Sequence, residues 1–406
     1  MREMKESGVE WIGEIPAHWS PIRFRFIAKI TTGNQDTQNA DPDGEYPFYV
    51  RSPIVERCNN YTFDGKGILM AGDGAGAGRV FHLVDGKYAV HQRVYRFYDF
   101  KYMDPVLLKY YLENLFATVM DYGSAKTTVP SVRLPMIQDF VVCVPPKKEQ
   151  DNIVAVLNEK CAQVGSLISN VQAQIEKLKA YKQSLITEVV TKGLDPTVPM
   201  KDSGFEWIGE IPAHWEVKRG KVLFEESDAR SADGSEELLT VSQYTGITPR
   251  SQKNVNMFEA LTLEGYKICD VGDIAANTMW LWAGAIGVSA YSGVISPSYN
   301  VYRQKAENFV PGYLDCLLRA PMLVQEYASR STGIRASRLR LYPKDFLDIM
   351  FPVPPFGEQQ EIMRVLSDKF AAVDKLIAIK ESKIEKLEQY KKSLIYEYVT
   401  GKREVM

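Results

Sequence analysis

The side chains that could perform acid–base or phosphate chemistry do not form a matched set in this sequence. His18 and His214, two of the four histidines, lie in two copies of the tetrapeptide PAHW, beside a Trp, which is typical of packed structural residues. The Gly-rich stretch GDGAGAGR at 72–79 lacks the GxGxxG spacing of a dinucleotide site and the GK[ST] ending of a phosphate loop. A tight turn is the better interpretation, and we predict that this chain is not an enzyme.

Other reactive arrangements are not supported by the sequence either. A pocket that methylates DNA amino groups needs an Asn/Asp-Pro-Pro-aromatic motif, whereas the Pro-Pro pairs here are followed by KKEQ and FGEQ, and no convincing PD…(D/E)xK nuclease set is present. The five cysteines lack CxxC spacing, which indicates reduced thiols and no metal site. The N-terminal MREMKESGVEW has no apolar signal core, and no apolar run could span a bilayer. We therefore expect a cytoplasmic protein that makes no membrane contact.

Basic and polar side chains gather in one stretch of each half of the chain. YASRSTGIRASRLRLYPK at 327–344 and YGSAKTTVPSVRLP at 122–135 contain no acidic residue. Such loops suit phosphate contacts, and Arg can also read guanine edges with two hydrogen bonds. A solvated loop is the alternative, and the net charge of −2 does not decide between them. The predicted DNA contacts are Lys126, Thr127, Thr128, Arg133, Arg330, Arg335, Arg338 and Arg340, with Gln92 and Arg93 as weaker candidates.

The chain consists of two copies of one unit. ESGVEWIGEIPAHWS begins at Glu6, and DSGFEWIGEIPAHWE begins at Asp202. A second block, PPKKEQDNIVAVL from Pro145, recurs as PPFGEQQEIMRVL from Pro354. Constant segments therefore alternate with variable ones in a cyclic order, and a repeat of this size predicts a pseudo-twofold pair.

The second block of each copy predicts a long helix. Apolar residues recur at alternating steps of three and four, with Lys182 at a seam position of the first helix and Lys380 and Lys391 in the second, which is a heptad pattern. Gly193 and Gly401 stand where a glycine would end each helix. We predict an antiparallel pair of helices of roughly forty residues that acts as a spacer between two domains. A generic charged coiled coil is the alternative.

The variable segments predict an α+β fold of mixed strands and helices. Strand-like runs such as YPFYV and SYNVYRQ precede one amphipathic helix late in each domain, at 104–122 and 310–328. Trp280 and Trp282 have the spacing of a strand, and the alternatives for them are to face a groove, to face a partner or to pack in the core. The predicted boundaries are a lead-in and first domain at 1–145, the first helix at 146–193, a lead-in and second domain at 194–353, and the second helix at 354–406.

This pattern resembles the specificity subunit of type I restriction-modification systems. The residues that carry the resemblance are the WIGEIPAHW lead-ins and the duplicated Pro-Pro-x-x-Glu-Gln that opens each helix. The resemblance implies a non-catalytic subunit with two target recognition domains, each of which reads one half of a split sequence in double-stranded DNA. Because the two variable domains differ in sequence, we expect the two halves to differ, so that the bipartite target is asymmetric. The resemblance also implies two methyltransferase subunits that bind S-adenosylmethionine and two restriction subunits that use ATP and Mg. No cofactor or metal is expected in this chain itself.

The repeated motifs are the expected attachment points. We predict that they anchor each recognition domain to the helices and to the methyltransferase subunits, through Trp11, Trp19, Trp207, Trp215, Glu149, Gln150, Glu358 and Gln359. Two other functions stay open: a coiled-coil scaffold that presents two protein-binding domains, and a methyltransferase with diverged motifs.

Overall fold

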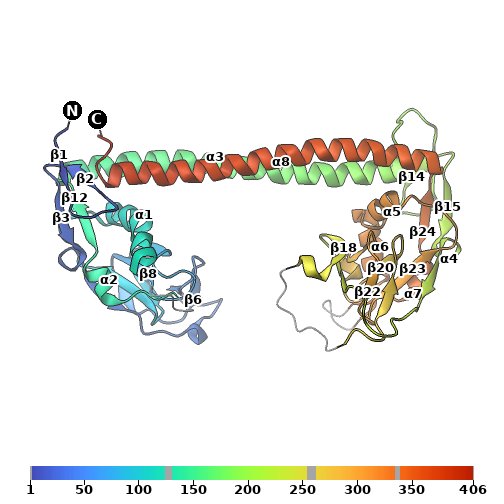
Figure 1. The fold of residues 1–406 in the computed structure, drawn as a ribbon, viewed down its shortest axis with the longest axis horizontal. Helices are drawn as coiled ribbons and strands as arrows, with labels where there is room; N and C mark the ends of the chain where they lie inside the picture. Colours follow the sequence, from blue (N-terminus) through green and yellow to red (C-terminus); the bar gives the residue numbers. More distant parts are fainter. Residues whose placement is uncertain (1, 124–129, 254–261, 334–338, 406) are drawn as a thin grey trace. The chain divides into compact units, whose positions relative to one another are not determined.

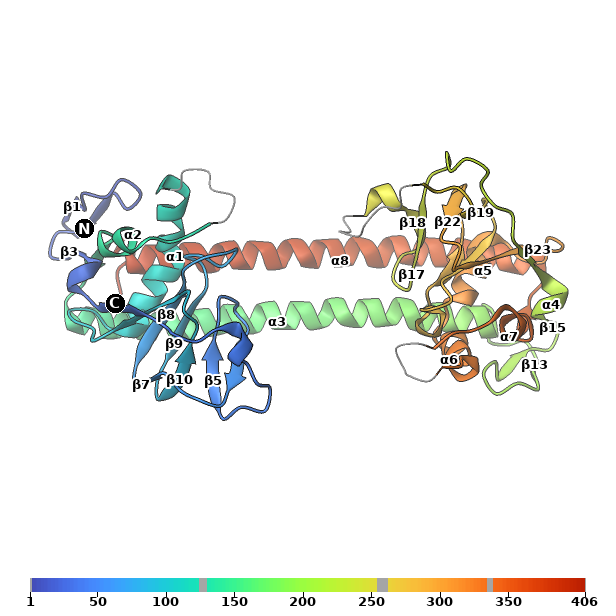
Figure 2. The same ribbon diagram turned by 90° about the horizontal axis from the view of Figure 1, so that it is seen from below.

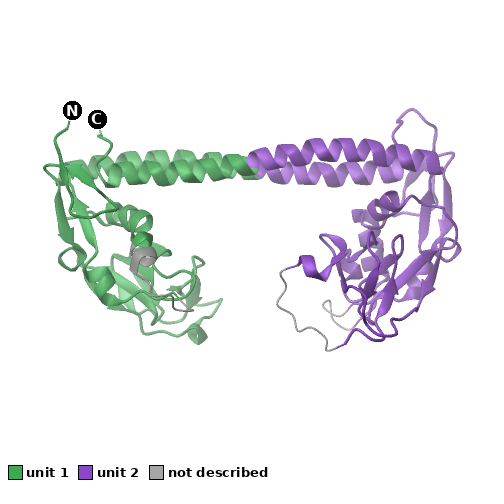
Figure 3. Cartoon of the chain, in the orientation of Figure 1, with its two compact units in different colours: residues 1–172, 381–406 green, residues 173–380 purple. Residues whose placement is uncertain are grey.

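The computed structural model describes residues 2–123, 130–253, 262–333 and 339–405. The chain divides into two compact units, residues 1–172 with 381–406 and residues 173–380 (Figure 3). Two long helices, α3 (Lys147–Lys192) and α8 (Phe356–Val399), each contribute one part to the first unit and one part to the second. The units are therefore assembled from both halves of the sequence.

The ends of the two long helices follow from the residues at each end. The amide groups of Glu149 and Gln150 donate to the carbonyl of Pro146 at 2.9 and 3.0 Å, which closes the first turn of α3. After each helix the chain turns at a glycine, Gly193 with φ 71° and Gly401 with φ 70°. This left-handed conformation is the common way to end a helix and favours glycine.

Within each unit the two long helices pack antiparallel, side by side (Figures 1 and 2). In the first unit, Leu157 and Cys161 of α3 share a core with Leu394 and Tyr398 of α8. In the second unit, the late α3 residues Leu185 and Val189 share a core with the early α8 residues Ile362 and Leu366. The heptad pattern thus forms the predicted coiled-coil seam, and the predicted fold class is confirmed.

Lys182 and Lys380, two lysines of the seam, have partners on the facing helix. In the second unit, the Nζ of Lys182 lies 2.7 and 2.9 Å from the carboxylate oxygens of Asp374 and 4.6 Å from the ring centroid of Phe370. Lys380 donates to Oε1 of Gln174 at 2.5 Å. A cation inside an apolar seam is tolerated here because the partner helix supplies an acceptor.

The first unit builds its domain from four small sheets. The hairpin β1–β2 and the pair β3–β12 are antiparallel, the sheet β4-β11-β8-β9 is antiparallel throughout, and the sheet β6-β5-β10-β7 contains one parallel pair, β5 with β10. The strands are Met4–Glu6 (β1), Glu14–Pro16 (β2), Ser20–Arg23 (β3), Lys29–Thr32 (β4), Tyr46–Tyr49 (β5), Glu56–Cys58 (β6), Phe63–Asp64 (β7), Gly67–Ala71 (β8), Phe81–Val84 (β9), Lys87–Val90 (β10), Val94–Tyr98 (β11) and Val141–Val144 (β12).

Helix α1 (Pro105–Gly123) connects this domain to the long helices. It contacts β8 and β9, and its Asn114 donates to the carbonyl of Lys392 in α8 at 2.9 Å. Leu107, Leu108 and Tyr111 are buried in the core that also holds Leu394. The short helix α2 (Leu134–Gln138) and the 3-10 turns η1 (Phe24–Phe26) and η2 (Thr37–Asn39) complete the domain.

The second unit repeats the same plan with different details. The pairs β13–β14 and β15–β24 and the sheet β16-β23-β20-β21 recur in the same order, while β17–β18 and β19–β22 stand as separate pairs. The strands are Met200–Asp202 (β13), Glu210–Pro212 (β14), Glu216–Arg219 (β15), Phe224–Ser227 (β16), Leu239–Ser242 (β17), Gly246–Pro249 (β18), Lys267–Cys269 (β19), Ile274–Ala276 (β20), Ile286–Val288 (β21), Gly293–Ile295 (β22), Asn300–Gln304 (β23) and Met350–Val353 (β24).

The late helix predicted at 310–328 is two helices in the structure. α5 (Pro311–Leu318) ends before Pro321, and α6 (Pro321–Arg330) begins there. The prediction of one helix was wrong because proline lacks the N–H of the helical ladder and favours the first helical position. The remaining short elements are α4 (Gly220–Leu223), α7 (Pro343–Leu347), η3 (Arg250–Gln252) and η4 (Leu281–Ala283).

Candidate nucleic-acid interface

The lead-in motif and the start of the long helix form one joint in the first unit. Trp19 donates its indole N–H to Oε2 of Glu149 at 3.0 Å, and Nε2 of His18 lies 2.9 Å from the same oxygen. Arg2 forms an ion pair with the other carboxylate oxygen. Burial raises the pKa of Glu149, but hydrogen bonds from His18, Arg2 and Trp19 outweigh burial and bring this pKa below its ordinary value.

The second unit contains the same joint without the arginine. Trp215 donates to Oε2 of Glu358 at 3.0 Å, and Nε2 of His214 lies 2.8 Å from that oxygen. Gly193 packs against this joint, because a Cβ there would lie 2.7 Å from Glu358 and 3.4 Å from Trp215. The repeated Glu of Pro-Pro-x-x-Glu-Gln therefore attaches the PAHW segment to the helix in both units.

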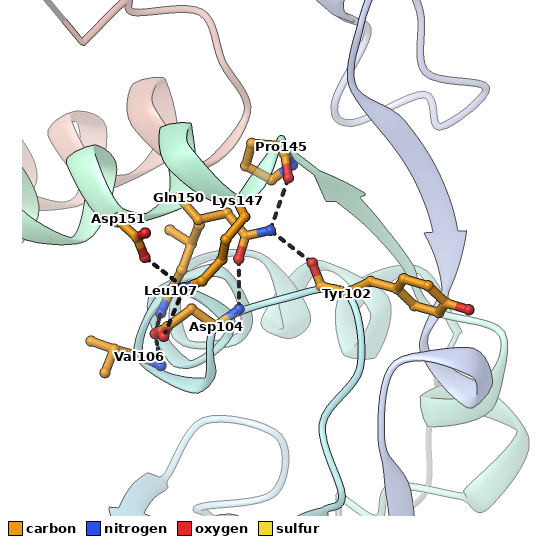
Figure 4. A network of polar contacts seen from close by, with 8 residues as sticks. All are labelled: Tyr102, Asp104, Val106, Leu107, Pro145, Lys147, Gln150 and Asp151. Carbon is orange, nitrogen blue, oxygen red and sulfur yellow. Dashed lines mark hydrogen bonds and ion pairs between the residues drawn. The ribbon is translucent and has the colours of Figure 1, made fainter.

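The repeated Gln of the motif ties the same helix start to the segment before α1. Gln150 donates to the carbonyl oxygens of Tyr102 at 2.7 Å and Pro145 at 2.8 Å, and it accepts from the amide of Asp104 at 2.7 Å (Figure 4). Asp104 in turn accepts the amide of Val106 at 2.8 Å, which caps the first turn of α1. The buried amide thus satisfies three backbone groups.

Gln359 does the same in the second unit. It donates to the carbonyls of Asn308 and Pro354, both at 2.9 Å, and accepts from the amide of Val310, also at 2.9 Å. Val310 precedes α5, the counterpart of α1. Each Gln therefore fixes the start of a domain helix relative to the start of a long helix.

These contacts bear on the eight residues that we predict to bind partner subunits. Trp19, Trp215, Gln150 and Gln359 are fully buried within the chain. Such side chains influence a partner only through the position of the joint. The other four, Glu149, Glu358, Trp11 and Trp207, are half-buried, and partner binding by any of the eight stays a prediction.

In the first unit, two segments that carry predicted DNA contacts meet the Gly-rich loop at one edge of the domain. The amide of Gly72 donates to the carbonyl of Arg93 at 2.9 Å, and the amide of Val132 donates to the carbonyl of Gly72 at 2.7 Å. Asp73 also forms a β-bridge with Ser131. The Gly-rich loop after β8 thereby joins Gln92, Arg93 and Arg133, which are all exposed.

Asp73 organises the charges at this edge. Its carboxylate lies 3.1 Å from Nη1 of Arg51 and 3.8 Å from Nε of Arg93. Gln92 donates to Asp36 at 3.0 Å. Arg51 and Asp73 are functional candidates that the sequence analysis missed. Asp73 could have been found, because it is a charged residue inside a Gly-rich loop. Lys126, Thr127 and Thr128 lie outside the described residues.

His91 supports the backbone of this edge. Its Nδ1 accepts the amide of Arg93 at 3.0 Å, and the ring is buried. Burial lowers the pKa of His91, and the nearby charge of Arg51 lowers it further. A neutral ring is needed for this bond, because the accepting nitrogen must carry a free lone pair.

In the second unit, an acidic side chain neutralises part of the positive charge of the basic stretch. Nε of Arg330 lies 2.5 Å from Glu326 of the same helix turn, so an acidic residue just before the stretch pairs with it. Thr332 and Arg340 form a β-bridge through both of their backbone bonds, at 2.9 and 3.0 Å, and Arg340 is exposed. Arg335 and Arg338 lie outside the described residues.

The strand-like spacing of Trp280 and Trp282 does not reflect a strand. Leu281 begins the 3-10 turn η4 between β20 and β21 and is fully buried, while Trp280 is 50% exposed. Of the alternatives left open for Trp280, the structure supports an exposed position and not a place in the core. The two indole rings stack, with centroids 5.8 Å apart and an interplanar angle of 26°.

Burial raises the pKa of the Cys269 and Cys316 thiols to about 12, which makes them poor nucleophiles. Across the described ranges, no three His, Cys, Asp or Glu side chains gather as metal ligands. Within the same ranges, every helix is too short or too polar to cross a bilayer.

Comparisons with known proteins agree with this geometry. Residues 16–177 match the family of the type I restriction modification DNA specificity domain. The type I restriction enzyme EcoDI specificity subunit of Escherichia coli is 22% identical over 396 residues, covering 89% of this chain and 83% of the relative. The MjaVIII specificity subunit of Methanocaldococcus jannaschii is 24% identical over 420 residues, covering 96% and 93%.

The fold is also found in a solved structure. A chain from the study of complex assembly and conformational transition of the type I R-M system superposes with a TM-score of 0.66, at 16% identity, over 96% of this chain and 99% of that chain. These findings confirm the resemblance predicted from the sequence. This chain is therefore similar, over most of its length, to the specificity subunits of type I restriction-modification systems.

Proposed function

We propose that this chain gives a type I restriction-modification complex its DNA sequence specificity, with each domain reading one half of an asymmetric, bipartite target. The observation that carries the proposal is that the two units share their joints and their main sheet but differ in the surface loops beside that sheet. The Trp19–Glu149 and Trp215–Glu358 joints are the same, as is the pairing of β4-β11-β8-β9 and β16-β23-β20-β21. The loops beside these sheets present arginines in one unit and stacked indoles in the other. Different surface chemistry supports different half-sites.

The long helices are proposed to set the number of unread base pairs between the half-sites. A helix of 46 residues such as α3 is about 69 Å long at 1.5 Å per residue. Two readers placed one DNA turn apart need about 34 Å. A helical spacer of this length leaves room for both domains beside one duplex.

Catalysis is assigned to partner subunits. Two methyltransferase subunits would supply S-adenosylmethionine chemistry, and two restriction subunits would supply ATP- and Mg-dependent translocation and cleavage. This chain would hold no cofactor of its own and would work in the cytoplasm. The domain joints, with their Trp and Glu residues, are the proposed frame on which the methyltransferase subunits assemble.

The first experiment maps methylated adenines in a host genome that carries the system, with and without this chain. A split, asymmetric motif is expected only when the chain is present. The purified complex should then retain a duplex with this motif, and retention should fall steeply with added salt because phosphate contacts release counterions. Duplex retention that depends on neither the DNA sequence nor the salt concentration would instead favour a scaffold that binds proteins.

Matched variants test the two edges. Arg93→Ala and Arg340→Ala should each weaken binding and lower the salt slope by about one, as expected for a lost phosphate contact. Arg364→Ala is the control, because Arg364 is an exposed arginine of α8 that pairs with Glu361 of the same helix.

Inserting one heptad into α3 and one into the facing part of α8 should change the spacer length in the mapped motif.

A further inference from the structure

Trp280 and Trp282 form a rigid aromatic platform on the second domain. The indole N–H of Trp282 donates to the carbonyl of Met279 at 2.9 Å, and the amide of Trp280 donates to the carbonyl of Asn277 at 2.9 Å. The amide of Ala285 returns to the carbonyl of Trp280 at 3.1 Å. The loop is therefore fixed by its own bonds, and the outer ring is presented to solvent in a defined orientation.

The platform is also anchored from below. Leu281, between the two tryptophans, is fully buried, and η4 packs on α6. Gly284 ends the turn with φ 87°, and a Cβ there would lie 3.1 Å from Val324 of α6. Leu281 already occupies the buried position of this turn. The folded loop therefore holds the neighbouring Trp280 at the surface.

The position of the platform matches the charged edge of the first unit. It lies between β20 and β21, whose counterparts β8 and β9 flank the Gly-rich loop with Asp73. In both units this loop is bonded to the segment before the neighbouring strand. Gly72 donates to the carbonyl of Arg93, and Thr278 donates to the carbonyl of Ser298 at 2.7 Å.

The surroundings of the platform favour a nucleic acid over a protein. The chain has no Asp or Glu between Asp273 and Glu307, and Thr278 and Ser298 supply hydroxyl groups beside the rings. A loop segment that has hydroxyl groups and no acidic residue of its own is compatible with a phosphate backbone, and an aromatic face stacks on any base. A protein interface would call for a wider apolar area than one indole face and the neighbouring Met279.

We propose that Trp280 stacks on a DNA base of the half-site read by the second domain, with Trp282 supporting its ring from behind. This inference rests on the proposed function and assigns a base contact that does not depend on charge. Apolar side chains that insert beside bases unstack a step of the duplex. The half-site of the second domain is accordingly expected to contain an easily unstacked pyrimidine–purine step.

The test measures the affinity of the assembled complex of full-length chain and methyltransferase subunits for a duplex with the mapped motif. Trp280→Ala should bind about ten- to a hundredfold more weakly, as expected for one lost base stack. Its salt slope should stay unchanged, because no phosphate contact is removed. Trp280→Phe should retain most of the affinity. Tyr181→Ala is the control, since Tyr181 is an exposed aromatic residue of α3 in the same unit.

Tryptophan fluorescence gives an independent readout. Trp19 and Trp215 are fully buried, and Trp11, Trp207 and Trp282 are half-buried, so the largest share of the quenching by bound duplex should come from Trp280 and be lost in Trp280→Phe. Equal affinity of wild type and Trp280→Ala would overturn the inference while leaving the proposed function intact. Loss of methyltransferase subunits from Trp280→Ala, with unchanged DNA affinity of the intact complex, would overturn it in favour of a protein contact. Failure of the wild type to select its motif would remove the proposed function itself.

Discussion

The indole nitrogen of Trp215 lies 3.0 Å from Oε2 of Glu358, and Trp19 and Glu149 repeat this pair at the same distance. Two domains with different strand arrangements are thus attached to their helices by one and the same bond. Because Trp19 and Trp215 are fully buried, removal of either acceptor leaves an indole N–H without a partner.

Glu149→Ala and Glu358→Ala are therefore expected to lower the free energy of unfolding by about 1–3 kcal/mol each. Glu149→Ala should cost more, because Arg2 also pairs with Glu149. Denaturant unfolding followed by near-UV circular dichroism measures both the loss and the changed environment of the indole. Glu361→Ala is the control, since its side chain is exposed and, among the described residues, bonds to the neighbouring Arg364 alone. Equal stabilities of all three variants would show that the joint contributes nothing.

Gln150→Leu should destabilise the first unit by about 3 kcal/mol or more, because it leaves two backbone carbonyls and one amide without their partner. Gln359→Leu should have the same effect in the second unit. Gln163→Leu, on the exposed face of α3, is the matched control, and its effect should stay within about 0.5 kcal/mol. Urea unfolding provides the comparison. An unchanged midpoint for Gln150→Leu would contradict the structural role of the motif.

Lys182→Leu should stabilise the helix pair. The side chain is 25% exposed and occupies a seam position, while its partner Asp374 is 59% exposed and stays solvated when left alone. Burying a leucine there is expected to add about 1 kcal/mol to the free energy of unfolding. Lys179→Leu, at a 55% exposed position, should give no comparable gain. A loss of stability in Lys182→Leu would show that the ion pair and the contact with Phe370 outweigh apolar burial.

The stability of the first unit should decrease in mild acid. Burial lowers the pKa of His82 and of His91 below the ordinary value of 6.5. The unfolded chain therefore binds protons more readily than the folded chain, so these histidines add full stability above pH 6.5 and lose it as the pH falls towards their folded pKa values. Each should change the free energy of unfolding by at most about 1.4 kcal/mol per pH unit. Unfolding at pH 7.5 and 5.5 measures this change, and the double variant His82→Gln, His91→Gln should flatten it.

The two long helices could be predicted from the sequence because their apolar residues repeat with a heptad period. Heptad spacing from Leu157 to Val189 and from Leu366 to Tyr398 is a local property of each helix, and it indicated the seam directly. Pairing of Lys182 with Asp374 could not be predicted in the same way, because it depends on the register of two segments far apart in the chain.

The candidate contact edge was predicted in part. Gln92, Arg93 and Arg133 were selected from the sequence by their chemistry, whereas their place beside one Gly-rich loop and the pairing of Asp73 with Arg51 depend on the tertiary fold. Composition also concealed the pairing of Arg330, since Glu326 lies just outside the acid-free stretch that drew attention to it. Alternating spacing at Trp280 indicated a strand, whereas backbone bonds within the loop produce a turn.

Antiparallel packing in each unit has a consequence for how the molecule is completed on the ribosome. The core of the first unit holds Ile153 and Leu157 together with Leu394, Ile395, Tyr398 and Val399. During synthesis, the second unit has all its residues once position 380 has left the exit tunnel. The first unit is completed later, because it also needs the C-terminal part of α8. The nascent first domain therefore carries an open apolar seam for most of translation, and the final turns of α8 close it.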